Sequence, residues 1–186
     1  MSKRKSIFGI AIICALVVAT ALSPRPAVAA TATELNRDGS AALAKLYATT
    51  PKAKELAALA KGILVFPNIV KAGFLVGGLF GEGVLVKDGK AAAYYSTVAV
   101  SYGYQVGMQK YGYAMFLMHD NALQYLDRSD GWELGTGPSI VIVDQGVAGS
   151  LSTSTARDDI YAFIFNQKGL MAGLGLQGSK ITKIEK

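Results

Sequence analysis

Glycine is distributed very unevenly along this chain of 186 residues, and its distribution limits the folds that are possible. Nineteen of the 21 glycines lie from residue 62 onward, where short segments rich in Val, Ile, Tyr and Phe separate them. Glycine weakens helices, whereas short β-branched and aromatic segments bounded by glycine are typical of strands. Few helical patterns lie between these segments, so the sequence predicts an antiparallel sheet rather than alternating strands and helices.

Short strands are predicted throughout this glycine-rich part. Lys87-Asp88-Gly89-Lys90 is a hairpin turn sequence between segments 81–86 and 91–100, because Asp-Gly readily adopts the backbone of a two-residue turn. A short helix is predicted over 121–126, with Asp120 as its cap. Further strands are predicted at 111–118, 138–143, 160–165, 169–176 and 180–184.

The glycine spacing also predicts that some strands bend. Residues 76–83 read VGGLFGEG and residues 169–176 read GLMAGLGL. Glycine inside a strand permits a bulge, a tight bend or the close approach of another backbone. Strands of this kind favour a sheet that curls toward a barrel.

Residues 31–60 come before the glycine-rich part and have a helical pattern. Thr31 and Glu34 have the spacing of a capping box, and leucines follow on one face. Thr50 and Pro51 begin a second helix, with proline at the first helical position. The predicted fold class is therefore α+β, with N-terminal helices packed on a strongly curled, mainly antiparallel, barrel-like β-sheet.

Residues 1–29 have the three parts of a secretory signal peptide. A basic start precedes the apolar run 7–22, and Ala27 and Ala29 are the small residues of an A-x-A cleavage site. The apolar run is short for a span of roughly 20 residues, although an uncleaved membrane anchor is the alternative. We therefore expect cleavage near Ala29, a periplasmic or secreted location, and a single domain formed by residues 30–186.

Removal of this leader would lower the net charge of the protein. The full chain has 19 basic and 13 acidic residues, which gives a formal net charge of +6. Four basic residues and no acidic residue lie in the leader, so the mature chain has 15 basic residues against 13 acidic ones. The resulting charge of +2 is too small for a nucleic-acid-binding surface of the usual kind. The one cysteine, Cys14, also lies in the leader, so the mature chain has no disulfide.

Residues 173–178 read G-x-G-x-x-G, which resembles a dinucleotide-binding motif. That motif needs a strand before it, a helix after it and an acidic residue about 20 positions later. Only eight residues follow Gly178, and they alternate like a strand. Ser179 and Lys180 also stand in the wrong order for a phosphate-binding P-loop. We therefore predict no nucleotide partner and no cofactor.

Few residues of this chain could perform acid–base or metal chemistry. His119 is the only histidine, and no G-x-S-x-G serine motif accompanies it. We expect His119 to end a strand and Asp120 to cap the helix that follows. Residues 127–131 read DRSDG but lack the glutamate at position 12 of a calcium loop, so we expect a turn there. The sequence predicts no catalytic residue, no metal site and no enzymatic activity.

Tyrosines are frequent in the predicted strands. They could pack the sheet through cross-strand pairs, which we favour, or they could form a lipid or stacking surface. The tyrosines concerned are Tyr94, Tyr95, Tyr102, Tyr104, Tyr111 and Tyr113.

Five lysines lie within residues 45–71, where Glu55 is the only acidic residue. A solvated helical face is the ordinary explanation of such a group. The alternative is a patch for anionic lipid headgroups, since each lysine near an anionic membrane contributes about 1 kcal/mol of binding. The residues that we select for this tentative lipid site are Lys52, Lys54, Lys61 and Lys71.

Three stretches of the chain resemble the SYLF domain family. They are AKGILVFPNIVKAGFLVGGLFGEGVLV at 60–86, YYSTVAVSYGYQVGMQ at 94–109 and YAFIFNQKGLMAGLGLQGSKITKI at 161–184. The opening K-G-I-x-V-F-P and the closing K-G-L-M-A-G are distinctive, and the similarity extends over nearly all of 35–184. The resemblance implies lipid binding, notably to phosphoinositides in eukaryotic members, and actin association in some members.

The residues and the resemblance together predict an exported, non-enzymatic lipid-binding protein, a bacterial member of the SYLF type. Residues 30–186 would form one SYLF-like domain that is helical over 31–60 and β-rich over 62–184. Its expected partner is an anionic lipid or membrane surface, and neither nucleotide nor nucleic acid is expected to bind. One alternative is a structural envelope module that binds a protein partner. A further alternative, which we favour less, is an outer-membrane β-barrel.

Overall fold

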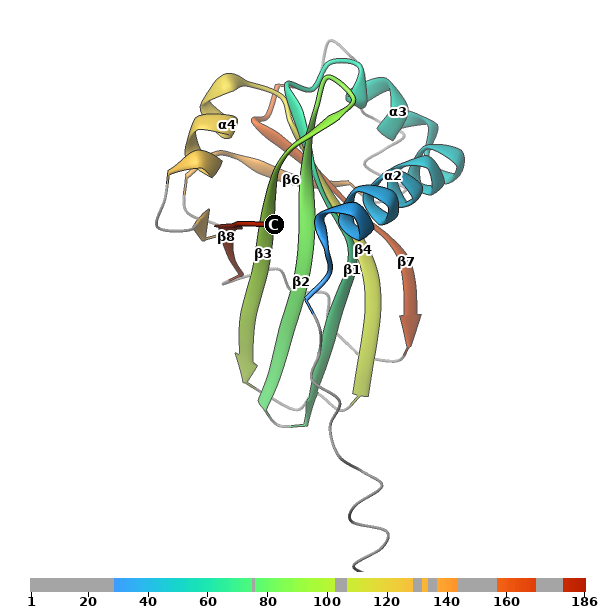
Figure 1. Cartoon of the computed structure of the whole chain (residues 1–186), viewed down its shortest axis with the longest axis vertical. Helices are drawn as coiled ribbons and strands as arrows, with labels where there is room; N and C mark the ends of the chain where they lie inside the picture. Colours follow the sequence, from blue (N-terminus) through green and yellow to red (C-terminus); the bar gives the residue numbers. More distant parts are fainter. Residues whose placement is uncertain are drawn as a thin grey trace, which may run out of the picture.

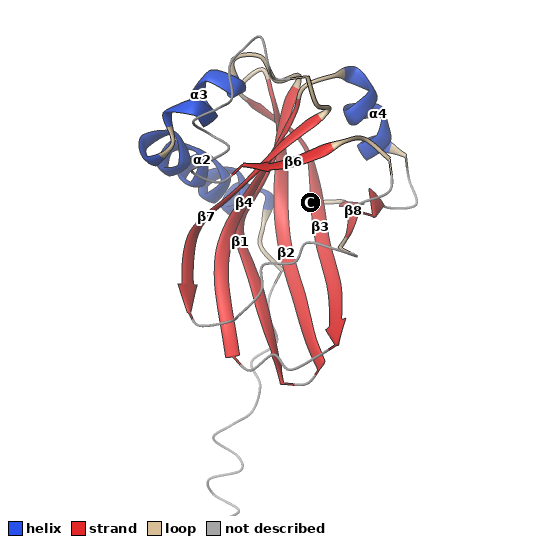
Figure 2. Ribbon diagram, turned by 180° about the vertical axis from the view of Figure 1, so that it is seen from behind, coloured by secondary structure: helices blue, strands red, loops and turns tan. Residues whose placement is uncertain are grey.

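A mixed 8-stranded sheet lies at the centre of the molecule, and helices pack on both of its faces (Figures 1 and 2). The computed structural model describes residues 29–74, 76–102, 107–128, 132–133, 137–143, 157–169 and 179–186. Within these residues, no helix is both long enough and apolar enough to cross a lipid bilayer.

Two helices precede the sheet, as the sequence predicts. Helix α2 (Ala32–Thr49) begins with the expected capping box, in which the Thr31 hydroxyl accepts from the Glu34 amide and the Glu34 carboxylate accepts from the Thr31 amide. Helix α3 (Pro51–Ala57) begins at the expected proline. The Thr50 side chain makes no capping hydrogen bond, so the fixed φ of proline starts α3 rather than a threonine cap.

Four long antiparallel strands form most of the sheet. They are β1 (Gly62–Phe74), β2 (Val76–Lys87), β3 (Lys90–Tyr102) and β4 (Gly107–Leu117). The predicted hairpin turn joins β2 to β3, and Asp88 and Gly89 both have positive φ angles, 50° and 73°. Positive φ at both central positions is what a two-residue hairpin turn of this hand requires.

Four shorter strands complete the sheet on either side of these four. They are β5 (Trp132–Glu133), β6 (Ile140–Val143), β7 (Ile160–Gly169) and β8 (Lys180–Ile184). The order across the sheet is β5-β8-β3-β2-β1-β4-β7-β6, and only the β6–β7 pair is parallel among the described strands. The α+β class with a mainly antiparallel sheet is therefore confirmed.

The described sheet is open, because β5 and β6 stand at its two ends and do not pair with each other. The barrel-like shape and the strong curl that the glycines suggested are thus not confirmed. The glycines of β2 instead let neighbouring strands approach closely. A Cβ atom on Gly83 would lie 2.6 Å from the Val65 carbonyl oxygen, and one on Gly81 would lie 2.8 Å from the Ile69 side chain.

Both faces of the sheet are packed at the end nearest the helices. On one face, α2 and α3 cover a core that includes Val65, Val84 and Phe116. We call this the α2 face. On the other face, helix α4 (Asp120–Asp127) covers a core that includes Met115 and Leu117.

The start of α4 corrects one prediction. The helix follows β4 as expected, but His119 occupies the cap position and Asp120 is already helical. Neither side chain caps the helix, and Asp120 stabilises it only as an acidic residue in the first turn. Other predictions lie outside the described residues, namely those on residues 1–28 and Tyr104, on most of the turn at 127–131, and on most of the strand at 169–176 with the glycines at 173, 175 and 178.

Candidate functional site

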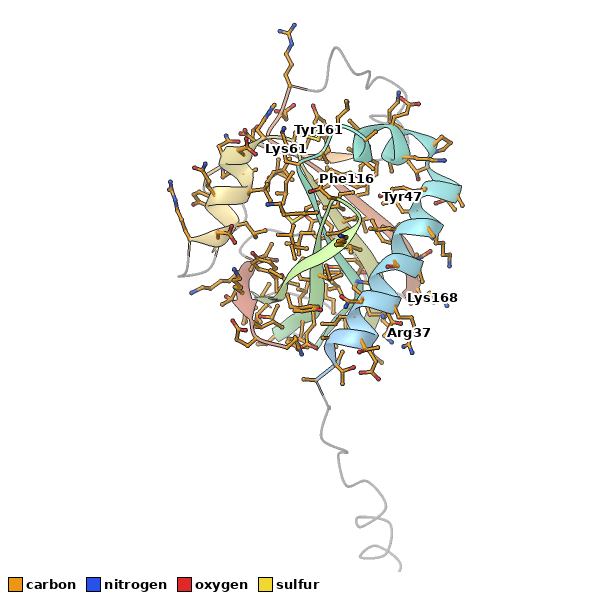
Figure 3. The ribbon with its side chains drawn as sticks, turned by 45° about the horizontal axis from the view of Figure 1, so that its top comes forward. Arg37, Tyr47, Lys61, Phe116, Tyr161 and Lys168 are labelled. Atoms are coloured by element: carbon orange, nitrogen blue, oxygen red, sulfur yellow. The ribbon has the colours of Figure 1, made fainter. Side chains whose placement is uncertain are left out.

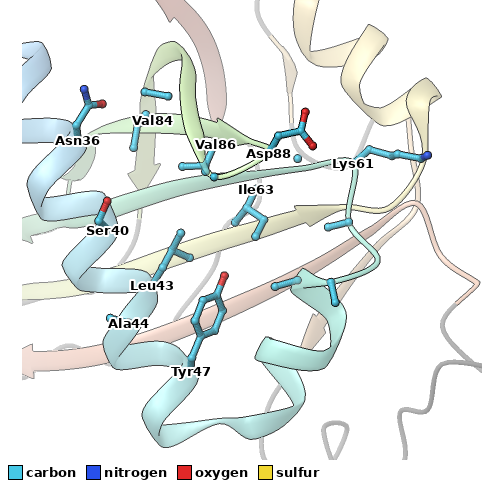
Figure 4. Close-up of a pocket in the computed structure, with 16 residues that line it drawn as sticks. Asn36, Ser40, Leu43, Ala44, Tyr47, Lys61, Ile63, Val84, Val86 and Asp88 are labelled. Carbon is cyan, nitrogen blue, oxygen red and sulfur yellow. The ribbon is translucent and has the colours of Figure 1, made fainter.

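A cleft of about 670 Å³ lies between α2, α3 and the neighbouring ends of β1 and β2 (Figure 4). Its floor is apolar and includes Ile63 and Val84, and Tyr47 of α2 stands at its side. Burial raises the pKa of Tyr47 above its ordinary value. Asn36, also on the cleft wall, accepts a hydrogen bond of 3.1 Å from the Tyr94 hydroxyl. An apolar floor with a few polar groups is typical of a small-molecule site.

Three of the four lysines selected from the sequence lie on or beside α3. Lys52 forms an ion pair with Glu55 three residues later, and Lys54 is exposed in the same helix. Lys61 is exposed and lines the cleft at the point where the chain leaves α3 for β1. The structure therefore brings these three lysines to one end of the molecule.

Lys71 does not join the other three lysines. It lies in the middle of β1 and is only 6% exposed. Lys71 is two residues beyond Ile69, which belongs to the core covered by α4, so its side chain points away from the α2 face. Lys71 therefore does not contribute to one site with the lysines near α3, because strand alternation places it on the opposite face.

A different surface on the α2 face has a more unusual character. Five large apolar side chains there are between 47% and 64% exposed, and the register of the strands places them side by side. We call this surface the apolar face. It consists of Val76 and Phe80 of β2, Val98 and Val100 of β3, and Met108 of β4.

The path of α2 explains why the apolar face is uncovered. The chain enters α2 beside Glu82, where the Ala30 amide donates to the Glu82 carboxylate over 3.0 Å. From there the helix runs toward the end of the sheet where α3 lies, and Gly39 packs against Val84 of β2. Residues of β2 that come before Glu82 lie beyond the start of α2, so their side chains on this face stay in solvent. Figure 1 shows the lower halves of β1 to β4 extending past the helices.

Lysines border the apolar face. Phe80 pairs with Val70, Val70 with Lys110, and Lys110 with Lys168, so these four residues form one row across the sheet. Lys45 of α2 joins Lys110 and Lys168 around a small cavity of about 200 Å³. We call these three lysines the basic rim. Figure 3 shows Lys168 on the side of the molecule where α2 lies.

The cavity of the basic rim forms at two irregularities in strand pairing. The register of β1 against β4 shifts between Phe66 and Ile69, and the register of β4 against β7 shifts between Lys110 and Gly112. Bulges of this kind change the direction of side chains locally. Asn68 and Asn166 line the cavity together with the lysines, and no acidic residue lines it among the described residues.

The tyrosines of β4 have a structural role. Tyr111 and Tyr113 point to the same face, as expected from their spacing, and both are buried in the core under α4. Burial raises the pKa of Tyr111 to about 12 and raises that of Tyr113 as well. Sheet packing is therefore confirmed for these two residues.

The described residues hold no group of three His, Cys, Asp or Glu side chains that could bind a metal ion. The Asp159 carboxylate accepts hydrogen bonds from the Asn121 amide nitrogen, the Ser139 backbone nitrogen and the Ser139 hydroxyl. These hydrogen bonds lower the pKa of Asp159, chiefly through Asn121. They join α4, the approach to β6 and the start of β7, so their role is to hold these elements together.

Comparison with known families finds one match. Residues 98–186 match the family model of Ysc84, which is described as a Las17-binding protein and actin regulator. The resemblance to the SYLF family is thereby confirmed for this part of the chain. A search of curated proteins found no match.

The SYLF match begins at the end of β3 and includes β4 and β7. It therefore contains Val98, Val100 and Met108 of the apolar face and two members of the basic rim, Lys110 and Lys168. The lysines selected from the sequence all come before residue 98, so the matched part of the SYLF family does not reach them.

Lys45 is one of the five lysines within residues 45–71, but it was not selected as a site residue from the sequence. Lys110, Lys168 and the apolar face were not predicted. The lysines are far apart in the chain, and only strand pairing brings them together. One signal could have indicated the apolar face. In residues 76–83, glycine occupies three of the four odd positions, whereas Val76 and Phe80 stand at even positions, so strand alternation places these two large apolar side chains on one face.

Proposed function

We propose that this protein is exported and binds anionic membranes without acting as an enzyme, through the apolar face and the basic rim. The observation that carries the proposal is their adjacency on one face of the sheet. A contiguous apolar surface in solvent is typical of a contact with a membrane or another protein. Lysines at its border favour a membrane with anionic headgroups.

The two parts of this surface have different tasks. The apolar side chains can enter the boundary between headgroups and acyl chains, where apolar burial contributes to binding on any lipid. The three lysines of the rim add electrostatic attraction of about 1 kcal/mol each on an anionic surface, so together they strengthen binding roughly 100-fold. A mature net charge of only +2 means that the attraction depends on where the lysines lie.

The lipid class agrees with what is associated with the SYLF family, whereas actin does not suit an exported chain. Removal of residues 1–29 during export would place residues 30–186 in the periplasm or outside the cell. Actin is a cytoplasmic protein of eukaryotes, so we do not extend the described actin role to this chain. The lysines near α3 stay a second hypothesis for the headgroup contact.

Vesicle binding tests the proposal and separates the two groups of lysines. Residues 30–186 are incubated with vesicles of phosphatidylcholine alone, or of phosphatidylcholine mixed with phosphatidylserine. The variant Lys45→Gln/Lys110→Gln/Lys168→Gln removes the rim. The control variant Lys52→Gln/Lys54→Gln/Lys61→Gln removes the same charge near α3. Circular dichroism confirms folding, since exposed charges contribute little stability.

We expect the rim variant to bind the anionic vesicles roughly 100-fold more weakly, while the control variant binds like the wild type. Binding of the wild type should weaken between 0.1 M and 1 M salt, because the Debye length falls from about 10 Å to about 3 Å. If the control variant alone loses binding, the headgroup contact lies near α3. Equal, background binding of the wild type to both vesicles would contradict the membrane function and favour an envelope protein as the partner.

A further inference from the structure

The beginning of the described chain is held by a carboxylate on the sheet. Glu82 of β2 lies on the α2 face, two residues from Phe80, and its side chain is only 12% exposed. One of its oxygens accepts a hydrogen bond of 3.0 Å from the backbone nitrogen of Ala30. The other oxygen forms an ion pair of 2.8 Å with the Lys186 ammonium.

Lys186 completes a closed arrangement of three residues. Its ammonium also donates to the Ala30 carbonyl over 2.8 Å, and its side chain is only 9% exposed. The carboxylate of Glu82 and the ammonium of Lys186 therefore bind the two polar groups of the same residue, Ala30. Helix α2 begins two residues later at Ala32, so this arrangement fixes the start of the helix on the sheet.

Ala30 is also the residue that would become the N-terminus after cleavage at the A-x-A site. Hydrolysis of the Ala29–Ala30 bond consumes one water molecule, leaving a carboxylate on Ala29 and an ammonium group on Ala30. The nitrogen that donates to Glu82 would then carry a positive charge at neutral pH, since free α-amino groups have a pKa of about 7.7 to 8.0. Cleavage would therefore change a hydrogen bond with one charged partner, the Glu82 carboxylate, into an ion pair between two opposite charges, and the added Coulomb attraction favours the bound ammonium group.

We propose that Glu82 is a binding site for the free α-amino group of Ala30, which forms when the leader is removed. The inference rests on the export part of the proposed function, and it is independent of lipid binding. Docking of the new N-terminus would stabilise the mature form over the precursor, in which the same nitrogen is a neutral amide. Glu82 would thus hold the processed end of the chain at the edge of the apolar face.

Acetylation of the N-terminus tests the site with almost no change in shape. All described helices and strands lie within residues 30–186, so this chain is prepared with either a free or an acetylated Ala30. The acetyl group restores the neutral amide of the precursor and keeps its N–H. We expect the acetylated chain to unfold about 2–4 °C lower, the shift that corresponds to roughly 1 kcal/mol in a domain of this size.

The variant Glu82→Gln shows whether this shift arises at the proposed site. The glutamine side chain at position 82 is neutral and cannot form an ion pair with the Ala30 ammonium group. Acetylation should therefore leave the melting temperature of Glu82→Gln unchanged. The control Lys186→Gln keeps the carboxylate, so acetylation should still lower its melting temperature. Equal melting temperatures of the free and acetylated wild-type chains would overturn the proposal, and this comparison holds even if Glu82→Gln does not fold.

Export from a bacterial host supplies the second arm of the test. The intact mass of the exported protein should correspond to a chain that begins at Ala30. A chain that begins at another residue would lack the group that Glu82 is proposed to bind, and would overturn the proposal. Loss of vesicle binding would not change either result, so failure of the lipid function is distinguishable from failure of this site.

Discussion

At the scale of single residues, two buried tyrosines have different surroundings. Tyr95 donates a hydrogen bond of 3.2 Å from its hydroxyl to Asp127. The Tyr113 hydroxyl is buried with no hydrogen-bond partner in the described part of the chain, while its ring stacks on Phe66 with centroids 6.4 Å apart. A buried polar group without a partner costs about 1–3 kcal/mol.

We therefore predict opposite effects when each hydroxyl is removed. Tyr113→Phe should leave the free energy of unfolding unchanged or raise it by about 1 kcal/mol, because the ring packing stays and an unpaired hydroxyl is lost. Tyr95→Phe should lower it by about 1 kcal/mol, because a made hydrogen bond is lost. Urea denaturation at neutral pH measures both. A Tyr113→Phe variant less stable than Tyr95→Phe would show that the Tyr113 hydroxyl has a partner.

At the scale of the element, β2 shows how one strand can have a crowded face and an open face. Its glycines at 81 and 83 face the core under α4, where neighbouring strands come close. Gly78 lies on the opposite side, among the residues of the apolar face, and a Cβ atom added there would have its nearest neighbour 4.0 Å away. Close packing therefore requires glycine at positions 81 and 83 of β2, whereas the space around position 78 does not.

We predict that these two kinds of glycine respond differently to the smallest substitution. Gly83→Ala should lower the free energy of unfolding by about 1–3 kcal/mol, because the new methyl group would overlap the Val65 carbonyl oxygen and the Phe66 ring. Gly78→Ala should change it by less than about 0.5 kcal/mol or raise it slightly, because the methyl group meets open space. Thermal unfolding of the two variants is the measurement. Equal losses would mean that the crowding at Gly83 relaxes without cost.

At the scale of the whole molecule, helices and bare sheet lie at opposite ends of the same face. The cleft and α3 stand at one end, and the apolar face lies beyond the start of α2 at the other. A membrane that contacts the apolar face would therefore leave α3 in water. This orientation distinguishes the proposed contact from one that uses Lys52, Lys54 and Lys61.

We predict that a dye on each end reports this orientation. Residues 30–186 contain no cysteine, so Met108→Cys and Ala58→Cys each supply one labelling site in this chain, and both residues are exposed. An environment-sensitive fluorophore at position 108 should shift to the blue when anionic vesicles are added, because it enters the apolar boundary of the membrane. The fluorophore at position 58 should keep its emission. A shift at position 58 alone would place the membrane at α3.

The sequence by itself determined the features that depend on local chemistry. The capping box at Thr31, the proline start of α3 and the Asp-Gly hairpin are all present, because each requires only neighbouring residues. The α+β class also followed from local periodicity. The predicted cap at Asp120 was wrong, because His119 occupies the cap position and Asp120 already lies in the first turn of α4.

The tertiary structure alone decided which residues form surfaces. Lys71 is close to Lys61 in the sequence, but strand alternation buries it on the opposite face. The basic rim joins Lys45, Lys110 and Lys168 across more than 120 positions of the chain, and Glu82 contacts both Ala30 and Lys186, which are far from it in the sequence. Strand register and the position where α2 begins create these groupings. Both depend on long-range packing, which no local pattern in the sequence records.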